Sequence, residues 1–198
     1  MATPVVKGRV AVRADIDIRR GVSGQFFDLA RDTVVGQTFH LPSADQRRTP
    51  PKDPIRLIVR ESTDGDYLAS IGVMFQQQGK SALELRLWRW AGSVKRTASR
   101  PENLLAAVAG GAGQPSGPSR HWVGFPLGLE LDAGNTYYFE LSASGGWEGW
   151  RLRQSYGWYG HRYDPTRSAY LDEEMLRGAD IPFTTYVWDV YDAEWVKR

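Results

Sequence analysis

Side chains with distinct chemistry alternate along the segment Leu83–Trp90. One alternating set consists of Leu83, Leu85 and Leu87, and the other of Glu84, Arg86, Trp88 and Trp90. In a β-strand such alternation puts the two sets on opposite faces of a sheet. A helix would put Leu83, Leu87 and Trp90 together but scatter Leu85 and Trp88, so the period of two favours a strand. We therefore expect a leucine face in the core and an outer face with aromatic and charged groups.

This outer face has the groups that sugar recognition requires. The apolar C–H face of a pyranose ring lies on an aromatic ring, and its hydroxyls form hydrogen bonds with guanidinium and carboxylate groups. We therefore predict a carbohydrate-binding face at Glu84, Arg86, Trp88 and Trp90. The alternative is that Trp88 or Trp90 caps the sheet edge or packs under a loop, as amphipathic indoles often do.

Two further segments repeat the alternation and would extend the same face if they share a sheet with Leu83–Trp90. The polar members of these segments are Tyr138, Glu140, Arg151 and Arg153. The alternative is ordinary cross-strand charge pairing, which contributes about 0.2–1 kcal/mol per pair.

A third candidate lies in the aromatic loop Gly157–Tyr163. Glycines in this loop allow sharp turns that present Trp158, Tyr159 and His161 outward, as the rim of a sugar site. The alternative is that the rings fold back and close one end of the sandwich.

Aspartates near both ends of the chain offer hard oxygen ligands for calcium. We take Asp28, Asp32 and Asp189 as the candidate ligands of a structural Ca²⁺. Calcium needs six to eight oxygens, and no spacing matches an EF-hand loop. Solvated turn aspartates are the alternative interpretation.

No enzyme signature is present in the sequence. His40, His121 and His161 lack the spacing of a zinc protease helix, and no G-x-S-x-G elbow occurs. Glu140 or Glu148 paired with Asp164 could flank a glycosidic bond, but a chain with 23 acidic residues offers many such pairs. We therefore expect a non-catalytic protein.

The composition narrows the partners. The 198-residue chain is 41% hydrophobic and 24% charged, enough for a core, and its net charge of +2 comes without a basic run that could follow a phosphate backbone. No apolar run is long enough to span a membrane. There are no cysteines, and the N-terminus lacks a signal segment, so we expect a cytoplasmic protein or a domain of a longer chain.

Strand-like segments separated by Gly and Pro turns dominate the chain. They predict an all-β fold, an antiparallel β-sandwich of the jelly-roll type. The two short helices expected are 99–107, with Ser99 as N-cap, and one turn at 172–176. We expect a single domain over 1–198, with an N-terminal strand or arm at 1–24 and a tail at 189–198.

Residues 30–188 resemble the jelly-roll accessory domains of bacterial polysaccharide-degrading enzymes, which are carbohydrate-binding modules of the galactose-binding-like type. The segments that carry the resemblance are Val35–Phe39, Leu83–Trp88, Trp122–Phe125, Leu129–Leu141, Trp150, Tyr156, Ala169–Tyr170 and Asp180–Tyr186. The resemblance implies non-catalytic sugar binding, often with a structural calcium ion.

Three functions follow from these observations. The first is binding of a polysaccharide or oligosaccharide that targets a catalytic domain in the same parent chain, outside the cell or at its surface. The second is a structural or interaction domain of a surface or assembly protein, in which exposed aromatics form a protein interface. The third is a jelly-roll enzyme that acts on polysaccharide.

Overall fold

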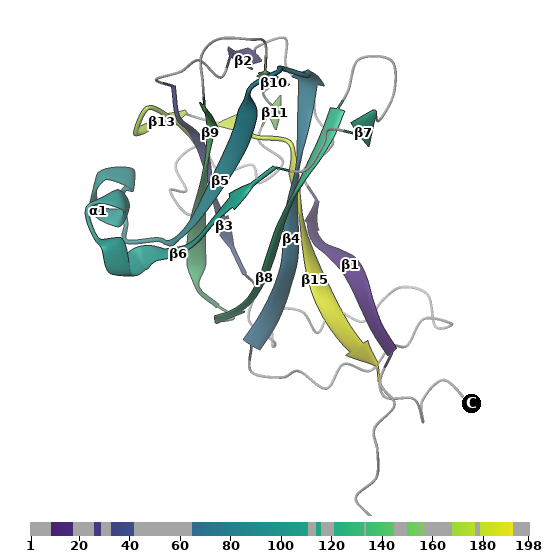
Figure 1. Ribbon diagram of the computed structural model, residues 1–198. Coiled ribbons are helices and arrows are strands. Elements are labelled where there is room, and N and C mark those ends of the chain that lie inside the picture. The colour runs from purple at the N-terminus through teal and green to yellow at the C-terminus, as the bar shows by residue number, and fades with distance from the viewer. Residues whose placement is uncertain are drawn as a thin grey trace, which may run out of the picture.

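The computed structural model is a sandwich of two antiparallel β-sheets with one short α-helix outside them (Figure 1). It describes residues 9–17, 26–28, 33–41, 65–110, 114–115, 121–132, 134–144, 150–153, 155–156, 168–176 and 179–191. The strands are β1 (Arg9–Asp17), β2 (Phe26–Asp28), β3 (Val35–His40), β4 (Gly65–Gln77), β5 (Ala82–Arg89), β6 (Leu104–Ala109), β7 (Gln114–Pro115), β8 (His121–Asp132), β9 (Thr136–Ser144), β10 (Arg151–Arg153), β11 (Ser155–Tyr156), β12 (Ala169–Leu171), β13 (Glu174–Leu176), β14 (Ala179–Asp180) and β15 (Phe183–Tyr191).

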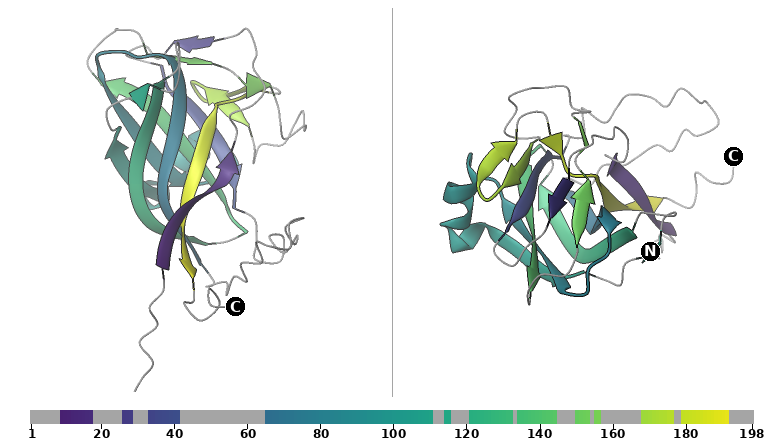
Figure 2. Two further views of the ribbon diagram at one scale, coloured as in Figure 1. Left: turned by 90° about the vertical axis from the view of Figure 1, so that its right-hand side faces the viewer. Right: turned by 90° about the horizontal axis from the view of Figure 1, so that it is seen from above.

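The strands form two large sheets and one short pair. Sheet A has the order β1-β15-β4-β10-β2, with β8 also paired to β4 and β7 to β8. Sheet B has the order β13-β12-β3-β9-β5-β6, and β11 pairs with β14. The pairings are antiparallel, so the predicted all-β antiparallel sandwich is confirmed. Figure 2 shows β1 running beside β15, the last strand of the chain.

The leucines of β5 point into the core, as their alternation predicts. Leu83, Leu85 and Leu87 are buried and pack in the main cluster of the interior. From sheet A, Val73 and Phe125 belong to the same cluster. Burial of each such side chain stabilises the fold by roughly 1.5–3 kcal/mol, so the inner face fixes which way β5 faces.

A buried polar clasp accompanies this apolar packing. The Gln37 side-chain amide donates to Asp180 Oδ1 at 3.1 Å, and its carbonyl oxygen accepts from the backbone N–H of Ile181 at 2.9 Å. Gln37 and Asp180 are fully buried, so these bonds satisfy groups that would be costly to leave unpaired. They fix β3 against the segment that leads into β15.

The helix expected at 99–107 is wrong. The α-helix α1 spans Val94–Ala98, with Ser93 as its N-cap and Ser99 as its C-cap, and the 3₁₀-helix η2 covers Pro101–Asn103. Leu104–Ala109 is strand β6. The expected turn of helix at 172–176 is also wrong, because β13 pairs there with β12 in a hairpin.

The ends of the chain join sheet A where the structure describes them. The predicted N-terminal strand corresponds to β1, and β15 continues to Tyr191, into the segment assigned to the tail. None of the helices in the described ranges has the length and hydropathy to cross a membrane.

Candidate functional site

Three charged side chains lie together on the outer face of sheet B. Arg86 of β5 is directly opposite Glu140 of β9, and their Nη1 and Oε1 atoms are 3.7 Å apart. The Arg86 Nε–H also donates to Glu84 Oε1 on its own strand. The side chains of Arg86 and Glu84 are 48% and 39% exposed, and that of Glu140 is 13% exposed. The structure therefore brings together these three predicted residues, with Glu140 the deepest.

Burial sets the electrostatics of Glu140. Desolvation raises the pKa of its carboxyl group above the usual value, and the charge of Glu84 adds to the rise. The Arg86 charge and the indole of Trp88 lower the pKa but do not cancel the rise. Glu140 therefore keeps its proton to a higher pH than an exposed glutamate does.

Trp88 and Tyr138 lie on the predicted outer face but are buried there. They are 7% and 1% exposed. The outer cluster that encloses them consists of Trp88, Trp90, Val94, Tyr138, Tyr170 and Met175. A sugar ring therefore cannot stack on Trp88 or Tyr138 in this structure.

Trp90 is the member of this set that stays partly exposed. It directly follows β5 and lies at the rim of the outer cluster. Its ring centroid is 5.8 Å from that of Tyr138 and 5.5 Å from that of Tyr170. The two tyrosines fix the orientation of the indole, which leaves a partly solvent-exposed aromatic surface.

Two elements cover the outer cluster. Helix α1 contributes Val94 and lies outside sheet B in Figure 1. The β12–β13 hairpin contributes Tyr170 and Met175, and the side chain of Asp172 at its turn accepts a hydrogen bond from Val34 N at 2.9 Å. This bond anchors the hairpin to the start of β3, so the cover depends on contacts far apart in sequence.

Close packing shows how tightly Tyr138 is held. A Cβ atom added to Gly36 on β3 would lie 2.1 Å from the Tyr138 hydroxyl oxygen and 2.3 Å from its ring. Tyr138 therefore lies directly over Gly36, on the neighbouring strand. The glycine is required here for close approach rather than for its backbone angles.

The indole N–H of Trp88 is an unsatisfied donor beside this charged group. Nε1 is buried and makes no hydrogen bond with any described residue. It lies near enough to the Glu140 carboxyl group to lower its pKa, but without the geometry of a hydrogen bond. The buried indole donor thus lies beside the carboxyl group without being well paired, which is unfavourable unless a third group bridges the two.

Arg151 and Arg153 do not extend this face, contrary to the expectation that their strand joins the sheet of Leu83–Trp90. Their strand, β10, pairs with β4 and β2 in sheet A. The alternation was correct for a strand, but it could not tell to which of two sheets that strand belongs.

Other predicted site residues fall outside what the structure describes. Trp158, Tyr159, His161 and Asp32 are not in the described ranges, and the side chains of Asp28, Asp189 and Arg153 are not described. Within the described residues, no group of three or more His, Asp or Glu side chains is placed to hold a metal ion. The calcium site therefore stays a prediction.

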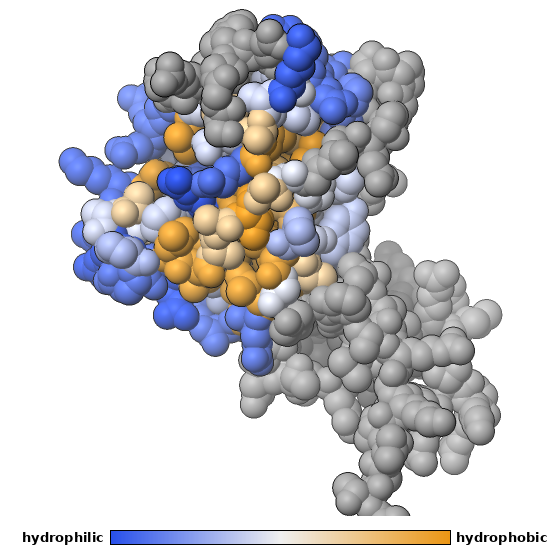
Figure 3. Space-filling model, in the orientation of Figure 1, coloured by the Kyte–Doolittle hydropathy of each residue, from blue (hydrophilic) through white to orange (hydrophobic). Residues whose placement is uncertain are grey.

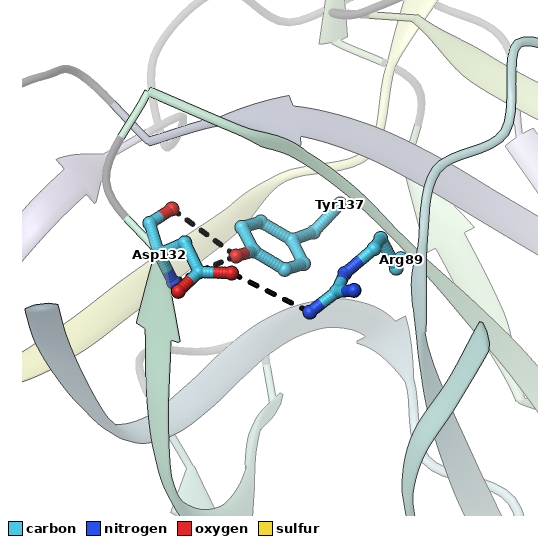
Figure 4. A network of polar contacts seen from close by, with 3 residues as sticks. All are labelled: Arg89, Asp132 and Tyr137. Carbon is cyan, nitrogen blue, oxygen red and sulfur yellow. Dashed lines mark hydrogen bonds and ion pairs between the residues drawn. The ribbon is translucent and has the colours of Figure 1, made fainter. Parts of the chain in front are cut away.

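A polar network lies at the C-terminal end of β5. Tyr137 accepts a hydrogen bond from Asp132 N at 2.9 Å and donates to Asp132 O at 3.1 Å, and Arg89 Nη2 is 3.4 Å from Asp132 Oδ2 (Figure 4). Burial raises the pKa of Tyr137, so its hydroxyl stays protonated as a donor. The network fixes the turn between β8 and β9 and has a structural role.

Sheet A has an aromatic pair of its own. The Trp122 ring lies over Gly72, where an added Cβ would be 2.1 Å away, and meets Tyr186 edge to face at 6.4 Å. Both rings are partly exposed. The pair therefore offers partly exposed aromatic surface on sheet A.

The residues that enclose the outer face could not be predicted from local sequence patterns. Val94 and Met175 are separated from Trp88 by turns whose direction the sequence does not determine. Tyr170 was part of the resemblance, but nothing in its local pattern indicated contact with Trp90. No protein-family model matches the chain, and no curated protein matches it.

Proposed function

We propose that this domain binds carbohydrate without catalysis, at the outer face of sheet B. The observation that carries the proposal is the unpaired Trp88 N–H beside the Glu140 carboxyl group, on the same outer face as the partly exposed ring of Trp90. A sugar hydroxyl can accept a hydrogen bond from the indole and donate one to the carboxylate.

The rest of the face supplies what a sugar ring needs. The exposed surface of Trp90 offers a flat apolar contact for the C–H face of a pyranose. Arg86 and Glu84 lie at the edge, exposed and already held in fixed positions by their mutual contact. Preformed polar groups lose little entropy on binding, but sugar hydroxyls give up water, so we expect modest affinity.

This proposal differs from the sequence interpretation in one respect. Trp90 replaces Trp88 as the stacking residue, and Trp88 becomes a hydrogen-bond donor beneath it. Targeting of a catalytic domain in the same parent chain, outside the cell or at its surface, belongs to this proposal. The resemblance to carbohydrate-binding modules is also part of the argument for this proposal.

Calorimetry and affinity electrophoresis across a panel of polysaccharides test the proposal. Trp90→Ala and Arg86→Gln should each weaken binding by about tenfold or more, because each removes a direct contact. Trp122→Ala removes a partly exposed indole from the other sheet, and Arg89→Gln removes an exposed charge from the same strand. These two controls should bind like the parent chain.

Two results would refute the proposal. One is the absence of binding to any glycan in the panel. The other is a loss with Trp122→Ala that equals the loss with Trp90→Ala, which would move the site to sheet A.

The second candidate function is a structural or interaction domain. The observation that favours it is the burial of Trp88 and Tyr138, which uses aromatic rings of the outer face to hold α1 and the β12–β13 hairpin in place. In that case Glu84, Arg86 and Glu140 are a surface ion cluster. A chain that binds no glycan but captures a protein partner through this face would support it.

A further inference from the structure

Strand β6 ends sheet B and has chemistry that edge strands usually avoid. It pairs with β5 on one side, and among the residues that the structure describes the order of sheet B ends with it. Its sequence, Leu-Leu-Ala-Ala-Val-Ala, contains no charged residue and no proline. Exposed edges in native proteins are commonly protected by such residues, because an open edge pairs with other strands.

Apolar surface surrounds this edge. Leu104 is 39% exposed, more than any other large hydrophobic side chain in the described ranges. Leu105 and Val108 of β6, and Leu127 and Leu129 of the neighbouring β8, are only partly buried against the core. Figure 3 shows hydrophobic surface gathered on this side of the molecule. The seam between the two sheets is therefore an apolar strip.

The backbone of β6 also has groups that point away from β5, on the side where no described strand pairs with it. Gly110 N donates to Leu83 O at 2.9 Å, immediately after β6. In an antiparallel ladder, residues bonded to the partner alternate with residues whose N–H and C=O point away. Gly110 bonds to β5, so the backbone N–H and C=O of Val108, two residues earlier, also point toward β5. The backbone groups of Ala107 and Ala109 therefore point to the opposite side of the strand.

We propose that β6 is a self-association site, at which β6 of a second copy adds antiparallel to extend sheet B across the two chains. The twofold axis would pass between Ala107 and Ala107 of the partner subunit. In this register, residues on the outer face of one copy pair with residues on the outer face of the other, and the inner faces match in the same way. A shift by one residue would instead join the outer face of one copy to the inner face of the other. It also places the open backbone groups of Ala107 opposite their own copies.

Charge complementarity supports a second copy as the occupant. The strip carries no charge, so a charged segment would lose water there without gaining a partner. The segment before Leu104 has three exposed basic side chains against one acidic one. Glu84, which also contacts Arg86, lies beside the Ala109 end. The basic residues are Lys95, Arg96 and Arg100, and the acidic one is Glu102. An antiparallel copy brings each basic end toward the other chain's Glu84 end.

The absence of cysteine makes this register directly testable. Ala107→Cys should be crosslinked to a dimer by a short bismaleimide, because the two positions would face each other across the axis. Ala98→Cys, exposed on α1, is the matched control and should give little dimer. Light scattering over a concentration series should show the 198-residue chain moving from monomer to dimer.

A charge at the axis should prevent association. Ala107→Lys should raise the dimer Kd by about 100-fold, because two like charges would meet across the axis. Ala98→Lys should leave the Kd unchanged, and far-ultraviolet circular dichroism checks that both variants are folded.

The proposal is overturned if the chain stays monomeric at all concentrations and Ala107→Cys is crosslinked no better than Ala98→Cys. A dimer that Ala107→Lys leaves intact would also overturn it, because the contact would then lie elsewhere. Glycan binding at Trp90 and Arg86 does not enter into any of these outcomes.

Discussion

Two aromatic regions of this molecule lie on opposite sides of sheet B and are built differently. In the interior, Phe39, Phe139 and Phe183 pack with ring centroids 5.2–6.2 Å apart, enclosed by both sheets. In the outer cluster, the rings of Trp90, Tyr138 and Tyr170 are 5.5–5.9 Å apart, a similar spacing. Ring contact alone therefore does not distinguish a core from a surface cluster.

The difference lies in what covers each region and what borders it. The outer cluster is covered by α1, which has five residues, and by a short hairpin. A helix of that length is not stable by itself and depends on the packing of Val94 and Thr97. Nearby carboxylates of Glu140 and Glu173 also raise the pKa of Tyr138, beyond the larger effect of burial. The outer cluster is thus covered by short elements and has charge at its border, so we expect it to open locally more readily than the interior.

The largest expected effect is in the interior. Phe139→Ala removes a fully buried ring that contacts Phe39 and Phe183, and should lower the free energy of unfolding by about 3–5 kcal/mol. Urea denaturation measures this change. Val94→Ala in the outer cluster should cost clearly less, and equal losses would mean that the outer cluster is as much a core as the interior.

A smaller effect is expected where the outer cluster meets β3. Gly36→Ala would drive a methyl group into the Tyr138 ring and should lower the free energy of unfolding by about 1–3 kcal/mol. Gly124→Ala is a matched control on β8, because an added Cβ there meets nothing within 4 Å. Urea denaturation compares the two, and near-ultraviolet circular dichroism reports whether the aromatic rings move.

The loss of stability in Gly36→Ala also shows how firmly Tyr138 is held in the outer cluster. If Tyr138 swings outward, the loss will be at the low end of this range and the near-ultraviolet signal will change. If Gly36→Ala costs no more than Gly124→Ala, the tight approach of Tyr138 to β3 is not maintained in solution.

The comparison also explains which features the sequence could predict. Alternation in Leu83–Trp90 correctly assigned the inner and outer faces of β5, because the period of a strand is a local property. It could not show that Trp88 is covered, because Tyr170 and Met175 arrive from a distant hairpin. Local patterning identifies a face, and only tertiary structure decides whether that face meets solvent.

The wrong predictions for Leu104–Ala109 and for Arg151 have the same origin. Leu104–Ala109 consists largely of leucine and alanine, which favour helices, but pairing with β5 makes it a strand. Arg151 has the alternation of a strand, but its sheet is set by contacts with β2 and β4. In both segments long-range pairing overrode or completed what the local sequence indicated.

The smallest expected effect concerns the charged border of the outer cluster. Burial raises the pKa of Glu140 above its usual value of 4.5, so the folded protein binds this proton more tightly than the unfolded chain does. Stability from this group is therefore present at low pH and is lost as pH rises from about 4.5 through the raised pKa in the folded state.

Glu140→Gln cannot titrate, so its free energy of unfolding should fall less over this interval. Urea denaturation at a series of pH values, on the parent chain and on Glu140→Gln, measures the difference. The opposite slope would mean that the Arg86 ion pair outweighs desolvation in setting the pKa of Glu140.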